Sequence, residues 1–225
     1  MSRLPSLLIS ELLAGYRTGQ FSPVEIIEQL LRAHTARPER REWIALLPSA
    51  SVRERARELA ARAPESLPLY GIPFAVKDNI DLESVPTTAG CREYAYTAAV
   101  SAPVVAHLIA AGAIPVGKTS LDQFATGLTG TRSPWGAGSV RVPAAFNNLI
   151  GLKPTCGSLS TRGVVPACRS LDCVGVLALT AAAAARVAAV AHGFDPQDPY
   201  SRAAPAAPAA PAARTLGALA LESPP

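Results

Sequence analysis

The residues of this sequence that could carry chemistry begin with Lys77. Residues 71–77 run through small and apolar side chains into the lysine, which predicts a short buried strand with Lys77 at its end. Apolar walls at such a place remove water from the amine, lower its pKa and leave it neutral and basic at pH 7. The alternative is a lysine that caps a strand in solvent, which is the commoner arrangement for an arbitrary strand.

A second candidate is Ser139, which follows the small residues Ala137 and Gly138. Gly138 has no side chain, so a turn at this point can bring backbone amides close to a ligand. A serine hydroxyl beside aligned amides would be a nucleophile next to an oxyanion hole. Spacing alone favours another interpretation, a glycine-rich turn whose serine caps a short helix at 142–148.

Residues 112–119 match the phosphate-loop pattern G-x-x-x-x-G-K-S/T. That loop needs a strand before its first glycine and flexible backbone between its glycines. Here a helix is predicted before Gly112, and Pro115 removes one of the amides that would bind phosphate. We therefore reject a nucleotide site at this position.

Composition narrows the classes of function. Charged residues make up 17% of the chain and apolar residues 49%, which is typical of a globular protein. The net charge of +4 comes from scattered arginines, so it gives little support for a nucleic-acid partner. The alanine-rich segment 181–191 contains Arg186 and is too short to span a membrane, and no membrane partner is expected.

Cysteine and histidine do not form a metal-binding pattern, since the sequence has no C-x-x-C pair and only three histidines. We therefore expect no metal site. Free buried thiols in a cytoplasmic protein are the expected state of Cys91, Cys156, Cys168 and Cys173. A signal peptide is not expected, because Glu11 interrupts the apolar start of the chain.

The elements that must position these residues alternate between helix and strand after residue 66. Helices are predicted at 6–14, from Ser22 through a capping box, and at 50–62, 104–111, 121–128, 142–148 and 181–192; strands are predicted at 71–77, 113–116 and 149–152. This order indicates an α/β fold, a mixed sheet flanked by helices. We divide the chain into an N-terminal helical arm (1–65), an α/β core (66–200) and an Ala/Pro-rich tail (201–225).

Several long blocks of sequence resemble the amidase signature family. They are GIPFAVKDNID at 71–81, GKTSLDQF at 117–124 and RVPAAFNNLIGLKPT at 141–155. Two further blocks, FATGLTGTRSP at 124–134 and GVVPACRSLDC at 163–173, resemble the allophanate hydrolase branch. The likeness runs from about Ser22 to Gly193, and it implies an incomplete amidase-signature fold.

The resemblance implies a mechanism and a role for each matching residue. In the family a neutral lysine takes a proton from a bridging serine in a cis peptide, and that serine activates the nucleophilic serine. Lys77 matches the base and Ser139 the nucleophile, while Ala137 and Gly138 match part of the oxyanion hole. Substrate binding falls to Arg169, near the substrate carboxylate, and to Gly127. No metal or organic cofactor is implied.

The chain departs from the family between two of its motifs. Trp135-Gly136-Ala137 runs directly into Gly138-Ser139, where the family has a long stretch that holds the bridging serine. No residue of this chain matches that serine. Most of the family's C-terminal part is also replaced by the Ala/Pro tail.

The sequence therefore leaves three functional hypotheses. The first is an amidase similar to allophanate hydrolase, which cleaves allophanate to ammonia and carbon dioxide in urea degradation, with turnover impaired by loss of the bridging serine. The second is a catalytically inactive remnant that serves only as a packing or oligomerisation partner. The third is another amidase, such as the glutaminase subunit of a tRNA amidotransferase. The expected partners are a small amide or urea-derived substrate and a second copy of the chain in a homodimer.

Overall fold

The computed structural model of the chain describes residues 5–36, 42–127, 144 and 147–203. Its helices are α1 (Ile9–Arg17), α2 (Pro23–Thr35), α3 (Ser49–Ala60), α4 (Pro103–Ala110) and α6 (Ala181–Ala191). Its strands are β1 (Trp43–Leu46), β2 (Pro73–Lys77), β3 (Pro86–Thr87), β4 (Tyr96–Thr97), β5 (Ile114–Thr119), β6 (Ile150–Leu152) and β7 (Val176–Ala178).

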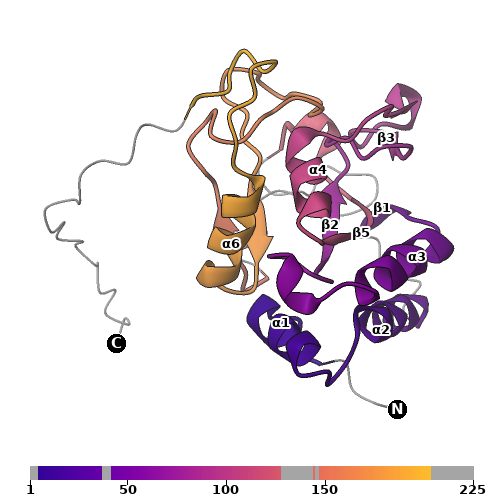
Figure 1. Cartoon of the computed structure of the whole chain (residues 1–225). Helices are drawn as coiled ribbons and strands as arrows, with labels where there is room; N and C mark the ends of the chain where they lie inside the picture. Colours follow the sequence, from indigo (N-terminus) through magenta and orange to yellow (C-terminus); the bar gives the residue numbers. More distant parts are fainter. Residues whose placement is uncertain (1–4, 37–41, 128–143, 145–146, 204–225) are drawn as a thin grey trace, which may run out of the picture.

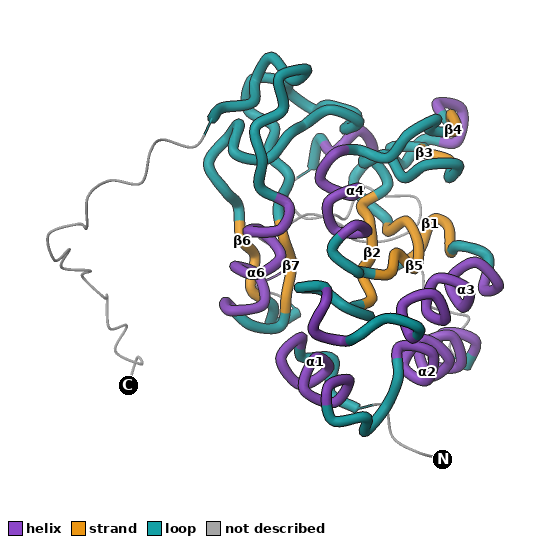
Figure 2. The backbone as a smooth tube through the Cα atoms, viewed as in Figure 1, coloured by secondary structure: helices purple, strands orange, loops and turns teal. Residues whose placement is uncertain are grey.

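The sheet that carries Lys77 has the strand order β1-β5-β2 (Figure 2). The strand β2 pairs with β5 in parallel, with Val76 opposite Lys118 and Lys77 opposite Thr119. The strand β1 pairs with the other edge of β5 in the antiparallel sense. Parallel neighbours need a crossover connection, and α4 lies in the chain between β2 and β5. The mixed α/β sheet that the sequence predicts is thereby confirmed.

The other strands in the described residues form two small antiparallel sheets. The strands β3 and β4 form one ribbon, and β6 and β7 form the other. The helix α6 packs on the β6–β7 ribbon and also on α4, which places the C-terminal part of the described chain beside the first sheet (Figures 1 and 2).

Local capping explains where two of the helices begin. Ser22 accepts a hydrogen bond from the Glu25 amide, the Glu25 carboxylate accepts one from the Ser22 amide, and Pro23 occupies the first turn of α2. Thr180 caps α6 by accepting a bond from the Ala183 amide. Both starts confirm the sequence prediction.

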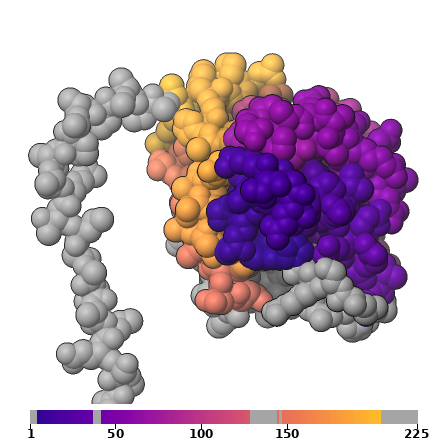
Figure 3. Space-filling view, turned by 60° about the horizontal axis from the view of Figure 1, so that its bottom comes forward, coloured from indigo at the N-terminus to yellow at the C-terminus, as the bar shows by residue number. Residues whose placement is uncertain are grey.

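The N-terminal helices pack onto the α/β core. One hydrophobic cluster joins buried residues of α1, α2 and α3 to residues at the starts of β2 and β5; its members include Leu12, Ile26, Leu59, Ile72 and Ile114. Seen from the side that α1 and α2 cover, their indigo surface lies directly beside the orange surface of the last described residues (Figure 3). Within the segment 1–65, the described residues 5–36 and 42–65 therefore contact the core closely, and β1 adds a strand to the sheet of the core. A domain boundary at residue 65 stays a prediction.

Three expectations from the sequence differ from the structure. The strand β2 is not buried throughout: it is an edge strand of the three-stranded sheet, and Ala75 is exposed. Residues 121–128 do not form an α-helix in their described part. Phe124 and Ala125 have φ of 52° and 55°, which a right-handed helix excludes, and only a short 3-10 turn at 123–125 remains. The third difference is that the strands β1, β3, β4 and β7 were not predicted from the sequence. The helix predicted at 142–148 lies mostly outside the described residues.

Candidate active site

Lys77 ends β2, as the sequence predicts, and its side chain is half-buried. Burial lowers the pKa of the amine from its usual value, while the carboxylates of Asp122 and Asp172 act in the opposite direction. Within the part of the chain that the structure describes, the amine makes no hydrogen bond or close ion pair. These conditions favour the neutral amine, which is the form that can accept a proton.

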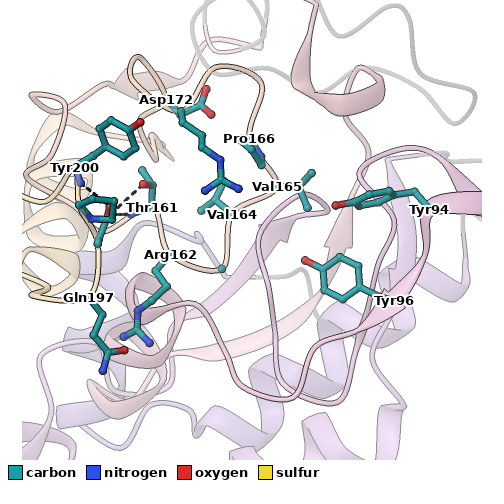
Figure 4. Close-up of a pocket in the computed structure, with 14 residues that line it drawn as sticks. Tyr94, Tyr96, Thr161, Arg162, Val164, Val165, Pro166, Asp172, Gln197 and Tyr200 are labelled. Atoms are coloured by element: carbon teal, nitrogen blue, oxygen red, sulfur yellow. Dashed lines mark hydrogen bonds between the residues drawn. The ribbon is translucent and has the colours of Figure 1, made fainter.

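Asp172 also lines a cavity of about 310 Å³. Figure 4 shows Tyr94 and Tyr96 on one side of the cavity and Tyr200 on the other, with Val164 between them. The cavity is large enough for a small ligand and offers aromatic, charged and backbone groups on its walls. Asp172 therefore acts electrostatically on the Lys77 amine and also forms part of the cavity wall.

Arg169, which the sequence analysis assigns to substrate binding, lies on the wall of this cavity and is exposed. No hydrogen bond or ion pair of its guanidinium to the described residues is found. Arg162 on the same wall differs, because its Nε donates to Asp195 at 2.9 Å. An unpaired guanidinium at a cavity can bind a planar carboxylate through two parallel hydrogen bonds.

The loop that carries Arg169 is held by its own aspartate. The carboxylate of Asp172 accepts hydrogen bonds from the backbone amides of Ala167 at 3.0 Å and of Cys168 at 3.1 Å. This closes the turn 167–172 around Arg169. Asp172 thus positions the arginine in addition to its effect on Lys77.

Gly127 lies beside the second carboxylate that acts on Lys77. A Cβ at this position would overlap the carboxylate of Asp122, so the glycine leaves room for that buried group. A role of Gly127 in substrate binding stays a prediction. Ser139, Ala137 and Gly138 lie outside the described residues.

A buried ion pair next to Lys77 was missed by the sequence analysis. Asp78 and Lys118 are both 0% exposed, and Lys118 Nζ lies 3.4 Å from Asp78 Oδ1. The signal is present in the sequence, because a lysine inside the apolar strand 113–119 needs a buried partner. In the sequence, Lys118 stands out only as part of a phosphate-loop pattern. The structure excludes a phosphate loop here, because Lys118 lies in the strand β5.

The described residues contain no cluster of three or more His, Cys, Asp or Glu side chains that could hold a metal ion. The four cysteines are free thiols as expected, but none of them is buried: Cys168 is exposed and the other three are half-buried. Among the helices of the described ranges, none has the length and apolar character needed to cross a bilayer.

Replacing Lys77 by methionine should stabilise the fold at pH 7. The pKa of the lysine is lower in the folded chain than in the unfolded chain, where it is about 10.4. At a pH between the folded and the unfolded pKa of Lys77, the unfolded state binds more protons than the folded state. As the pH falls through this range, the wild type therefore loses about 1.4 kcal/mol of stability for each unit by which the two pKa values differ. The methionine variant escapes this cost.

Urea unfolding of Lys77→Met at pH 7 and at pH 10 tests this expectation. The gain should shrink as the pH approaches the unfolded pKa of about 10.4. Lys153→Met removes the same charge from an exposed position and serves as the control. A Lys77→Met variant no more stable than wild type at pH 7 would contradict the burial of the amine.

Comparison with known proteins shows which family this sequence matches. The family model described as Amidase matches residues 25–137 and 136–219. The two matched pieces meet at residues 136–137, next to the place where the sequence indicates a missing stretch.

Individual relatives are similar over most of this chain. Urea amidolyase of Saccharomyces cerevisiae is 44% identical over 200 residues, which cover 72% of this chain and 11% of that protein. Allophanate hydrolase of Kluyveromyces lactis superposes with a TM-score of 0.79 at 40% identity, over 89% of this chain and 40% of that one. One glutamyl-tRNA(Gln) amidotransferase subunit of Chloroflexus aurantiacus is 34% identical over 222 residues, 81% of this chain and 46% of that protein.

This chain thus spans less than half the length of each of these relatives. The residues matched by the family model include the β2 strand and the Arg169 loop. The chain belongs to the amidase family.

Proposed function

We propose that this chain is an amidase similar to allophanate hydrolase, with turnover impaired by the absence of a bridging serine. Its substrate is a small amide derived from urea that carries a carboxylate. In this proposal Lys77 is the base, Ser139 the nucleophile, and Ala137 and Gly138 provide oxyanion donors. The observation that carries the proposal is the half-buried amine of Lys77, which has no hydrogen-bond or ion-pair partner among the described residues and feels the charge of Asp172 on the cavity wall.

Arg169 and Gly127 complete the proposal as substrate-binding residues. The guanidinium lies on the cavity wall without a protein partner among the described residues, as a carboxylate site requires. An identity of 44% to a urea amidolyase, against 34% to the amidotransferase relative, favours allophanate over glutamine as the parent substrate. The block around Arg169 points the same way.

Ligand binding should survive even where catalysis does not. Malonate has the two carboxylates and the size to reach Arg169, and we expect weak but measurable binding by calorimetry. Arg169→Ala should abolish the heat, because it removes the charged fork. Arg186→Ala, an exposed arginine of α6 away from the cavity, should leave it unchanged. Absence of heat with the wild-type chain would contradict the proposed site.

The competing hypothesis is an inactive remnant that only packs against a partner. It predicts no malonate binding at the cavity and no effect of Arg169→Ala on any ligand. The two hypotheses therefore separate on the same titration.

A homodimer and a cytoplasmic location stay proposals. The apolar faces of α1, α2 and α3 lie against the core of the same chain. A dimer would therefore use another surface, and light scattering of the full chain decides whether it forms. Four free thiols are compatible with a reducing compartment.

A further inference from the structure

Asp78, the residue directly after Lys77, is anchored through its backbone and its carboxylate. Its backbone N–H donates to Thr119 O at 3.1 Å, and its backbone C=O accepts from the Ala89 amide at 3.2 Å. Carboxylate oxygen Oδ2 accepts from both the amide and the hydroxyl of Thr88. The remaining oxygen, Oδ1, faces Lys118 Nζ at 3.4 Å and has no hydrogen-bond partner among the described residues.

Lys118 reaches the opposite side of this anchor from β5. Its amine donates to Thr87 Oγ1 at 3.0 Å, and the Thr87 hydroxyl donates to Asp81 Oδ1 at 2.9 Å. The hydroxyl of Tyr96 donates to the same oxygen of Asp81 at 2.7 Å. These hydrogen bonds form a continuous series from Lys118 to Tyr96, and Tyr96 lies on the cavity wall.

A second connection leaves the strand end in the other direction. Asn79 O accepts from the Val165 amide at 2.7 Å, and Asn79 Nδ2 donates to Val165 O at 3.1 Å. Ile80 forms a bridge with Val164 one step further along. Both valines lie on the cavity wall in the segment that leads to Arg169.

The strand end that carries Lys77 is therefore tied to two walls of the cavity: one connection starts from Lys118 of the buried ion pair, and the other from Asn79, which follows Asp78. We propose that Asp78 and Lys118 are positioning residues for Lys77: their ion pair fixes the amine of Lys77 relative to the walls that carry Tyr96 and Arg169. This inference rests on the proposed function, in which Lys77 is the base.

Burial of the Asp78–Lys118 ion pair is not explained by a gain in folding stability alone. Two charges lose their water when they are buried, and apolar residues of the same size often stabilise a core as well or better. An ion pair with directed hydrogen bonds does what apolar contacts cannot, since it sets one orientation of the backbone. Removing either charge should therefore loosen the strand end and let water reach Lys77.

The effect on Lys77 is geometric. The charged groups that act on its amine are Asp122, from the segment after β5, and Asp172, from the Arg169 loop. Neither variant of the ion pair alters these carboxylates. A change in the titration of Lys77 would thus report a change in its position and solvation.

The test is competitive acetylation of the full chain with trace acetic anhydride, followed by peptide mass spectrometry. The rate at Lys77 is measured between about pH 6 and pH 11, around the ordinary lysine pKa of about 10.4, and Lys153 is the exposed internal reference. In Asp78→Asn and in Lys118→Met we expect the Lys77 midpoint to rise by about one pH unit, part of the 3–5 units that full burial can produce. Thr88→Val, which removes one hydroxyl and no charge, should give a smaller rise.

The control is Glu28→Gln, which breaks the half-exposed ion pair between α2 and α3. It should leave the midpoint unchanged. A merely structural ion pair would lower the melting temperature of the variants without moving the Lys77 midpoint in the folded protein, and that result would overturn the inference. Thr88→Val decides if the charge variants do not fold, because its unchanged midpoint also counts against the inference.

The same measurement separates this inference from the proposed function. If Lys77 titrates like Lys153 in the wild-type chain, the proposed base is wrong and the positioning role falls with it. If Lys77 titrates at a lower pH but no variant moves its midpoint, only the positioning role is wrong. Because the readout is acetylation, it does not depend on turnover.

Discussion

Allophanate incubated with this chain should release no ammonia above the uncatalysed background. By its resemblance to the family, Lys77 needs a bridging serine to pass the proton, and no residue of the sequence matches it. A proton-transfer group typically contributes about 10²–10⁴ to the rate, and each oxyanion donor about 10²–10³. The missing stretch removes groups of both kinds. These effects are not strictly additive, but together they bring the rate near the background.

Burial lowers the pKa of the Lys77 amine from its usual value, which favours the neutral form that can accept a proton. The loss lies in the proton path. A base acts within hydrogen-bond reach, about 2.6–3.2 Å, or through one water. Without the bridging hydroxyl, the amine would have to reach Ser139 directly or through such a water.

An ammonia assay and a fluorophosphonate probe test this expectation together. We expect neither ammonia nor labelling of Ser139. Stoichiometric labelling that disappears in both Ser139→Ala and Lys77→Ala would show the prediction wrong and would establish a working nucleophile. Labelling that survives in Lys77→Ala would mean that Ser139 reacts without the base. Only loss of labelling in both variants would therefore support an active enzyme.

Helix starts were predictable from the sequence because capping is local. Ser22 and Glu25 meet across one turn, and Thr180 meets the third residue of α6. The strand β1 was not predictable in this way, since its partner β5 lies some seventy residues further along the chain. The helix expected at 121–128 failed because Phe124 and Ala125 adopt positive φ, which a periodic pattern cannot reveal.

The candidate site shows the same division. Lys77 could be found because a lysine after an apolar run stands out, and Arg169 because a block of sequence resembles a known branch. Asp122 and Asp172 could not be assigned to Lys77, since their effect depends on how two distant loops fold. Asn79 is close to the lysine in sequence, but its bond to Val165 joins residues 86 positions apart.

Lys118→Met should be the most damaging single substitution near the site. It leaves the carboxylate of Asp78 at 0% exposure without a counter-charge. Breaking a buried pair by removing one partner typically costs about 3–5 kcal/mol. Urea unfolding at pH 7 should therefore show a much lower midpoint, with the denaturant slope unchanged if only stability is affected.

The double variant Asp78→Asn/Lys118→Met should recover part of this loss, because it removes the unpaired charge and keeps an oxygen for the Thr88 amide. Coupling between residues in contact commonly reaches about 0.5–3 kcal/mol. Arg53→Met, in the half-exposed pair with Glu28, is the matched control and should cost far less than Lys118→Met.

The pH dependence of the Lys118→Met deficit identifies its cause. An unpaired buried carboxylate has a higher pKa in the folded chain than in the unfolded chain, where it is about 3.9. As the pH falls through the folded value, the native state takes up a proton before the unfolded state does, and the variant gains stability relative to wild type. The deficit should therefore shrink between pH 7 and the onset of acid unfolding. A deficit that stays constant over that range would mean that lost packing of the lysine side chain, and not the buried charge of Asp78, destabilises the variant.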